Sequence, residues 1–231
     1  MAGATALKLL QYWLIHRRRI DTLEKLTIQS ELSQLKNQIN PHFLFNTLQS
    51  MSGIAMLHGE REVCELAAGM AGLFYYALKG GDTVEVKEEL GMLRQYLEIM
   101  GTRLQGKFTW SVDVPDSMLD IVIPKMLLQP LVENAIFHGI EPKGCAGHIR
   151  IHVGYETSDN TEKIRIDVTD DGVGMTADKA AQVLRSNDDS SADFFREIGV
   201  SNVHKRLQYQ FGAEYGITIE SKEGEYTSMS I

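Results

Sequence analysis

The chain changes its pattern of apolar and polar residues near residue 105. Before that point the spacing is helical and predicts three helices, at about 20–57, 59–79 and 87–104. The first contains a 4-3-4 seam typical of a coiled coil or helical bundle, formed by Ile28, Leu32, Leu35 and Ile39. The first two helices, joined near Gly59, predict an antiparallel hairpin. Because a hairpin cannot bury its apolar stripe alone, we expect it to form a four-helix bundle with a second copy.

Beyond residue 107, apolar and polar residues alternate in short segments, which predicts strands. Helical segments lie between them: one begins after Pro124, one covers about 176–186, and one runs from Gly199 to Phe211. Helices beside a mixed or antiparallel sheet make an α+β sandwich. The predicted strands are 108–114, 148–156, 163–171, 217–221 and 226–231.

The first residues carry a short apolar run with Tyr12 and Trp13, followed at once by HRRR. An aromatic pair before an arginine cluster is typical of the cytoplasmic end of a transmembrane helix. The run is shorter than the roughly 20 apolar residues of a full span, and an ordinary amphipathic helix fits it equally well. We therefore expect three parts: a membrane-proximal helix or remnant of a transmembrane helix end at 1–19, a helical dimerisation region at 20–105, and an α/β domain at 106–231.

Composition and charge narrow the function further. The 231 residues are 43% apolar and 23% charged, as in an ordinary globular protein. The formal net charge of −8 argues against a nucleic-acid partner, because binding by counterion release needs a basic face. Cys64 and Cys145 lie far apart without metal-ligand spacing, which indicates a reduced, cytoplasmic setting.

Three short motifs carry the candidate chemistry, and the first is LVENAIFHG, with Glu133, Asn134 and His138. A carboxamide one helical turn before a histidine places both side chains on one face. Amide and carboxylate oxygens are suitable ligands for Mg²⁺. Taken alone, such a pair is more often a polar helix edge than a site.

The second motif, DDGVGM, follows a predicted strand. Gly172 and Gly174 allow a turn in which backbone approaches a ligand closely. Asp170 offers a carboxylate that can accept a hydrogen bond from an exocyclic amine such as adenine N6. The motif alone is weak evidence, because turns after strands favour Asp and Gly anyway.

The third motif is IGVSNVHKRL, in which Gly199 is predicted to open a helix. Free N–H groups at a helix start form a ready phosphate site. Asn202, Lys205 and Arg206 lie within two turns of that end. A capped surface helix explains the same pattern.

The order of these motifs resembles that of the GHKL ATP-binding fold. Upstream, QINPHFLFN together with LLQPLVENAIFHGI is similar to sensor histidine kinases of the LytS type. The similarity runs from about Leu32 to the end of the chain. It implies an α+β protein in which an N-terminal helical hairpin forms a dimeric four-helix bundle and a GHKL (Bergerat-type) α/β sandwich follows.

The resemblance makes His42 the phosphoacceptor. Its imidazole, with a reference pKa near 6.5, is largely neutral in the cytoplasm, so a ring nitrogen can attack phosphorus. Pro41 removes the helical hydrogen bond to the carbonyl of Asn37 and is expected to bend the helix. Asn46, one turn after His42, is expected either to hold a water for dephosphorylation of a response regulator or merely to pack.

For the ATP-binding half, the resemblance assigns Asn134 to Mg²⁺ and Asp170 to adenine, and it makes residues 186–199 a lid over ATP. Glu133 is expected to orient the metal or assist proton removal. The remaining expected nucleotide contacts are His138, Gly172, Gly174, Gly199, Asn202 and Arg206.

Two residues depart from the family pattern. Glu197 stands where many relatives have glycine, and its charge near the triphosphate is expected either to weaken nucleotide binding or to accompany a differently placed lid. Phe43 follows His42 in place of the acidic base that many other histidine kinases carry.

The implied protein is a homodimeric, ATP-dependent protein-histidine kinase that passes phosphate to an aspartate of a response regulator. The chain would be its cytoplasmic portion, anchored in the plasma or inner membrane by preceding sequence. A degenerate scaffold with little kinase activity is an alternative, favoured only by Glu197. A GHKL ATPase or an anti-sigma type serine kinase is another, disfavoured by the helical hairpin that carries PHFLFN.

Overall fold

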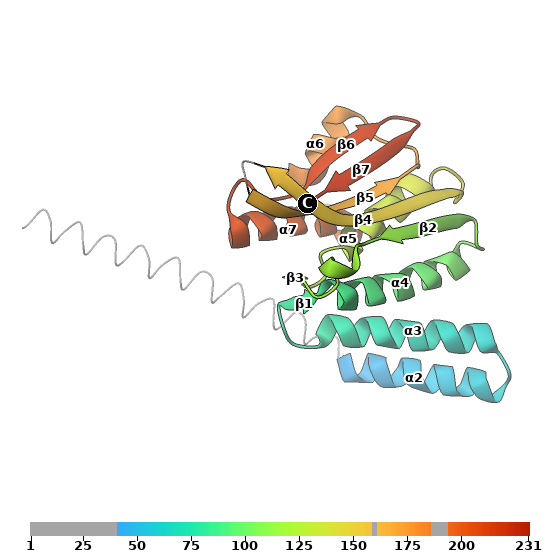
Figure 1. Ribbon diagram of the computed structural model, residues 1–231. Helices are drawn as coiled ribbons and strands as arrows, with labels where there is room; N and C mark the ends of the chain where they lie inside the picture. Colours follow the sequence, from blue (N-terminus) through green and yellow to red (C-terminus); the bar gives the residue numbers. More distant parts are fainter. Residues whose placement is uncertain (1–40, 159–160, 186–193) are drawn as a thin grey trace, which may run out of the picture. The chain divides into compact units, whose positions relative to one another are not determined.

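A computed structural model describes residues 41–158, 161–185 and 194–231. The chain divides into two compact units, Met1–Cys64 and Glu65–Ile231. In the first unit, helix α2 spans Pro41–Leu57 (Figure 1). The expected membrane-proximal segment and the expected coiled-coil seam lie outside the described residues. No helix in the described part of the chain is both long and apolar enough to cross a membrane.

The second unit contains a five-stranded sheet in the order β2-β4-β5-β7-β6 (Figure 1). β2 and β4 are parallel, and the other neighbouring pairs are antiparallel. A short antiparallel pair, β1 with β3, forms a separate ladder. The strands are β1 (Thr83–Glu85), β2 (Phe108–Asp113), β3 (Val122–Pro124), β4 (Gly147–Ser158), β5 (Thr161–Asp170), β6 (Thr218–Lys222) and β7 (Tyr226–Ser230).

Helix α3 begins in the first unit and continues into the second, and the other helices lie wholly in the second. A π-helical turn continues α5 directly, and a short 3₁₀ turn precedes β3. The helices are α3 (Arg61–Leu78), α4 (Val86–Arg103), α5 (Gln129–Asn134), α6 (Ala177–Arg185) and α7 (Phe194–Phe211), with the π-helical turn at Ala135–Ile140 and the 3₁₀ turn at Asp116–Met118.

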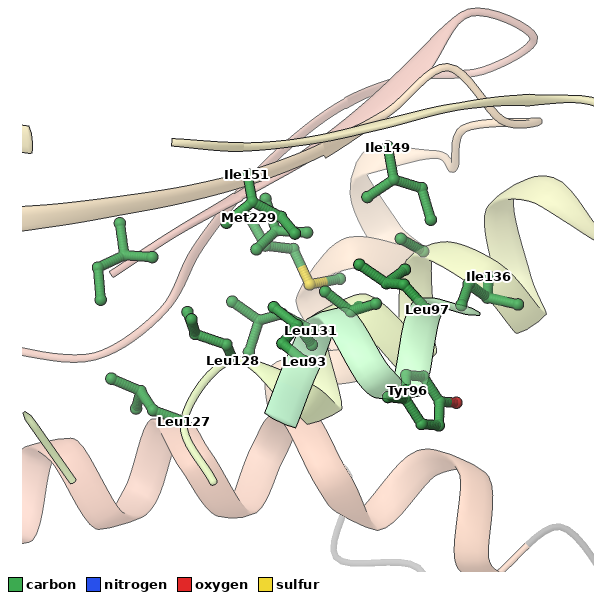
Figure 2. Close-up of a cluster of buried hydrophobic side chains, with 14 of the residues drawn as sticks. Leu93, Tyr96, Leu97, Leu127, Leu128, Leu131, Ile136, Ile149, Ile151 and Met229 are labelled. Atoms are coloured by element: carbon green, nitrogen blue, oxygen red, sulfur yellow. The ribbon is translucent and has the colours of Figure 1, made fainter. Parts of the chain in front are cut away.

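The core lies between one face of the sheet and the helices beneath it (Figure 2). In β4, Ile149 and Ile151 are fully buried while Arg150 between them is exposed, as the period of two requires. Leu97 of α4 and Leu131 of α5 meet this apolar face. The predicted α+β class is confirmed.

Two predicted helix starts are wrong. After Pro124 the chain stays irregular until Gln129. The backbone N–H groups of 126–128 donate hydrogen bonds to the Glu89 carboxylate of α4 instead of continuing a helix. The last helix begins at Phe194, so Gly199 lies inside α7 and does not open it. The segment FFREI contains no helix breaker, which lets the helix extend toward the N-terminus.

Candidate functional site

Asp170 lies at the end of β5, and glycines surround its carboxyl group. Its side chain is buried, and its Oδ1 accepts a hydrogen bond of 2.9 Å from the backbone N–H of Gly172. A Cβ atom on Gly139, in the π-helical turn, would overlap the Asp170 carboxylate. A Cβ atom on Gly172 would overlap the backbone of Gly139. The first and second sequence motifs therefore pack in direct contact, and only glycine fits at their junction.

The turn after Asp170 is fixed on two sides. Val173 N–H donates to the carbonyl of Gly139 (3.1 Å), and Gly224 N–H donates to the carbonyl of Val173 (2.6 Å). Gly174 has a φ of 63°, and a Cβ atom there would overlap the carbonyl of Lys222. Backbone contacts thus hold this turn between the π-helical turn and the β6–β7 hairpin, as close packing of glycines allows.

Burial sets the acidity of Asp170. Desolvation raises its pKa from 3.8 to about 7; nearby Asp171 adds to the rise, while the Gly172 N–H and Lys143 oppose it. A ligand that donates a hydrogen bond to the charged carboxylate would lower this pKa again. The group is therefore poised to respond to a donor such as an exocyclic amine.

The carboxyl end of α5 holds Glu133 and Asn134. Asn134 is buried at the last position of the helix. Gln129 Nε2 donates to Glu133 Oε1 (2.9 Å), and Tyr96 of α4 also hydrogen-bonds this carboxylate. Burial raises the pKa of Glu133, and these two hydrogen bonds oppose the rise. The carboxylate is therefore oriented by α4 and by its own helix; its expected catalytic role stays a prediction.

His138 lies half-buried in the π-helical turn, four residues after Asn134. The pair therefore spans the change from α- to π-helical geometry. The two residues share one continuous helical segment, as the sequence indicated, and their proposed nucleotide roles stay predictions.

The third motif lies on α7. A Cβ atom on Gly199 would come 3.1 Å from Pro130 Cβ, so this glycine lets α7 approach α5 closely. Asn202 is exposed. Arg206 is half-buried: its Nη2 donates to the carbonyl of Lys125 (2.8 Å), while its Nε finds no acceptor among the described residues. These contacts place Arg206 against the segment that leads into α5.

The candidate phosphoacceptor lies on α2. His42 occupies the second position of the helix, and Asn46 follows one turn later. Asn46 is exposed, and its carbonyl accepts a hydrogen bond from Ser50 Oγ (2.8 Å). The side chains of His42, Phe43 and Glu197 lie outside the described part of the structure, as does Asn37 before the expected bend.

The residues around Asp170 fit a nucleotide better than a protein-held metal cluster. The junction packs backbone closely around one buried acceptor, the Asp170 carboxyl group, and such an acceptor suits a ligand with an amine. Among the described residues, no group of three or more His, Cys, Asp or Glu side chains could hold a metal ion. Amide and phosphate oxygens are the other suitable ligands for a divalent cation, and Asn134 as such a ligand stays a prediction.

Several residues in this arrangement were missed by sequence reasoning. Thr227 of β7 pairs with Asp170 and is buried, and its Oγ1 lies 3.0 Å from Ser221 Oγ. Gly139 could have been found from the sequence, because it is a glycine within a helical pattern next to His138. Glu89 could have been found as well, because it is a charged residue on the apolar face of α4.

Comparisons with known proteins agree with this geometry. The family described as "Histidine kinase" matches residues 30–108, and the family described as "Histidine kinase-, DNA gyrase B-, and HSP90-like ATPase" matches residues 120–231. The chain is 30% identical over 203 residues to the protein YwpD of Bacillus subtilis, covering 87% of this chain and 69% of YwpD.

Two longer relatives are named as kinases. This chain is 32% identical over 206 residues to sensor histidine kinase YesM of Bacillus subtilis, and the match covers 88% of this chain. It is 30% identical over 203 residues to sensor histidine kinase/phosphatase LytS of Staphylococcus aureus, and that match covers 87%. The chain spans 33% of YesM and 34% of LytS. The chain belongs to the sensor histidine kinase family and carries that family's ATP-binding domain of the GHKL type.

Proposed function

We propose that this chain is the kinase portion of a two-component sensor. It transfers the γ-phosphoryl group of ATP to His42, from which the group passes to an aspartate of a response regulator. The observation that carries the proposal is the buried Asp170 in its glycine junction, because it is a specific acceptor for an adenine amine. The family membership and the PHFLFN segment on α2 support the histidine as acceptor.

Adenine selection follows from the chemistry of Asp170. Its carboxylate accepts from the N6 amine, whereas guanine presents a carbonyl oxygen at the corresponding position. Two acceptors facing each other in a buried place leave both unpaired, which costs about 1–3 kcal/mol per group. The site is therefore expected to prefer ATP over GTP.

Phosphoryl transfer needs positioning and charge neutralisation. Asn134, together with phosphate oxygens, would hold Mg²⁺, which supplies neutralisation of the phosphate charge when bound. A ring nitrogen of His42 forms the new bond to the γ-phosphorus, the bond to the leaving oxygen of ADP breaks, and the ring proton is released. Glu133, oriented by Tyr96 and Gln129, is the proposed acceptor of that proton.

The proposed dimer rests on the apolar surface of α2. Ile54, Met56 and Leu57 are 58%, 72% and 87% exposed in the single chain. A second copy of the same hairpin would cover such a surface in a four-helix bundle. The pattern before residue 19 supports a membrane anchor in sequence preceding the kinase portion, which would then face the cytoplasm.

Asn46 is proposed to serve dephosphorylation of the response regulator. A carboxamide one turn after His42 would lie near the phospho-aspartate of a docked regulator and can orient an attacking water. LytS carries phosphatase in its name. In Asn46→Ala, we expect the phosphorylated regulator to live longer while His42 labelling persists. Loss of both activities together would make Asn46 a kinase or structural residue instead.

The proposed function is tested by incubating the protein with γ-labelled ATP and Mg²⁺. We expect label that is lost in acid and kept in base, as for phosphohistidine, and none from α-labelled ATP as the matched control. Label stable to acid would indicate a serine kinase. Nucleotide binding without any label would favour the scaffold alternative.

A further inference from the structure

Glu89 is a buried carboxylate that joins three segments of the second unit. It is 3% exposed on α4. Its Oε1 accepts the backbone N–H groups of Leu127 (2.8 Å) and Leu128 (3.2 Å), and its Oε2 accepts that of Met126 (3.0 Å). The Tyr76 hydroxyl of α3 donates to the same Oε2. One side chain therefore connects α3, α4 and the segment before α5.

Two cations complete this arrangement. The Lys125 ammonium donates to the carbonyl of Lys79, just beyond α3 (2.6 Å), and lies 4.6 Å from the centre of the Tyr76 ring. Arg206 of α7 donates to the carbonyl of Lys125, and its charge interacts favourably with Glu89. The Arg206 charge offsets part of the cost of desolvating the Glu89 carboxylate. We call Tyr76, Glu89, Lys125 and Arg206 the clamp.

The clamp sets where α5 begins. The helix has only six residues, no side-chain cap, and proline near its start. In its first hydrogen bonds, the N–H groups of Leu131 and Val132 donate to the carbonyl of Leu128. The N–H group of Leu128 in turn donates to the Glu89 carboxylate. Even with the π-helical turn that continues it to Ile140, so short a helical segment has little stability of its own, so its position depends on this outside support.

We propose that Tyr76 and Glu89 are positioning residues for the nucleotide site and couple the end of α3 to it. Asn134 closes α5, and Gly139, which contacts Asp170, follows in the same helical segment. Loss of the Tyr76 hydroxyl leaves the buried Glu89 carboxylate with one donor fewer and thereby loosens the start of that segment. Nucleotide affinity then falls. This inference rests on the proposed ATP-binding function.

The coupling has a direction in the chain. α3 leads in sequence from the helix that carries His42 to the ATP-binding domain. A signal that shifts its last turn would act on Tyr76 and Lys79, and thereby on the start of α5. Linkage requires the reverse effect as well: a bound nucleotide must stabilise the clamp by the same factor.

The test compares adjacent residues that differ in their contacts. Tyr76→Phe removes the donor hydroxyl and keeps the ring, and Glu89→Gln removes the charge. Tyr75→Phe and Glu88→Gln are the matched controls, since these side chains are exposed neighbours. Affinity for a fluorescent ATP analogue with Mg²⁺ is measured beside amide hydrogen exchange of residues 126–134, with and without ATP.

We expect each clamp variant to weaken analogue binding about fivefold or more, to speed exchange at 126–128, and to lose the protection that ATP gives those amides. The controls should match the wild type. Should Glu89→Gln fail to fold, as judged by circular dichroism, Tyr76→Phe alone decides.

Faster exchange at 126–128 with unchanged analogue affinity would overturn the inference, because the clamp would then be structural only. Unchanged exchange in Tyr76→Phe would overturn it too. A wild-type protein that binds no analogue would overturn the proposed function itself, and the inference with it.

Discussion

The ATP-binding domain buries its large apolar side chains within the chain, whereas helix α2 leaves several of its own exposed. In the domain, Ile149 and Ile151 of β4 and Leu131 of α5 are fully buried within the chain itself. In α2, the large apolar side chains of Met51, Ile54, Met56 and Leu57 are about half exposed or more. The first region completes its core alone, and the second leaves apolar surface that only a further contact can cover.

This difference in burial indicates which region suits nucleotide binding and which suits assembly and the proposed phosphoacceptor. A domain that closes its own core can hold a precise ligand site, such as the one proposed at the junction of Gly139, Asp170 and Gly172. A helix that leaves apolar surface open is suited to assembly and to presenting a reactive side chain. Acceptor and nucleotide functions should therefore be separable by mutation.

The largest effect is expected for His42→Gln. It should abolish labelling by γ-labelled ATP while nucleotide affinity stays at the wild-type level, because the proposed acceptor lies outside the self-contained domain. His58→Gln, in the exposed turn after α2, is the control and should label normally. Wild-type labelling of the His42 variant would remove His42 as acceptor and break the division of functions.

Asp170→Asn should separate stability from function within the domain. Asn presents a donor to adenine N6 and should weaken ATP binding at least about tenfold, as loss of a charged hydrogen bond predicts. It should also stabilise the nucleotide-free domain above pH 7, because the wild-type carboxylate is desolvated there. The measurements are calorimetric titration with ATP and denaturant unfolding.

The sign of the pH effect is fixed by the raised pKa. The folded state of the wild type holds the Asp170 proton up to about pH 7, whereas the unfolded state loses it near 3.8. The unfolding free energy of the wild type should therefore fall relative to the Asn variant as pH rises from 4 to 7. The gap can reach about 4 kcal/mol. A stability difference between the two proteins that stays the same from pH 4 to pH 8 would contradict the desolvated carboxylate.

Ile54→Asp should break the proposed assembly. Burying a charge in the bundle would raise the dimer dissociation constant by about tenfold or more, measured by analytical ultracentrifugation. Nucleotide affinity should not change. Gln49→Asp, at an exposed polar position of α2, is the matched control. A wild-type protein that is already monomeric at high concentration would refute the dimer.

The smallest effect is expected for Glu197→Gln, which removes a charge from the first turns of α7 and keeps helix propensity. Interactions between solvated charges are worth about 1 kcal/mol or less, so ATP affinity or labelling rate should rise severalfold at most. Arg196→Gln, next to it, should act in the opposite direction. A slower Glu197→Gln enzyme would give this residue a positive role in the lid.

The sequence by itself determined the α+β class and the order of the longer helices and strands. These follow from local periodicity: β4 alternates strictly, and α3 and α4 keep one apolar face. The first two motifs could also be read in advance, because Asp170, Gly172 and Asn134 lie in short stretches of distinctive composition.

Only the tertiary structure decided how the site is supported. The late start of α5 depends on Glu89, which lies 37 residues before Met126. A pattern of neighbouring residues therefore cannot predict where this helix begins. The three-residue strands β1 and β3 are too short to show a period of two. The sequence predicts Arg206 as a nucleotide contact, which stays a prediction, and only the fold shows that its Nη2 donates to the Lys125 carbonyl. Hydrogen bonds between distant segments form only once the chain is packed, and they fix where a local preference begins and ends.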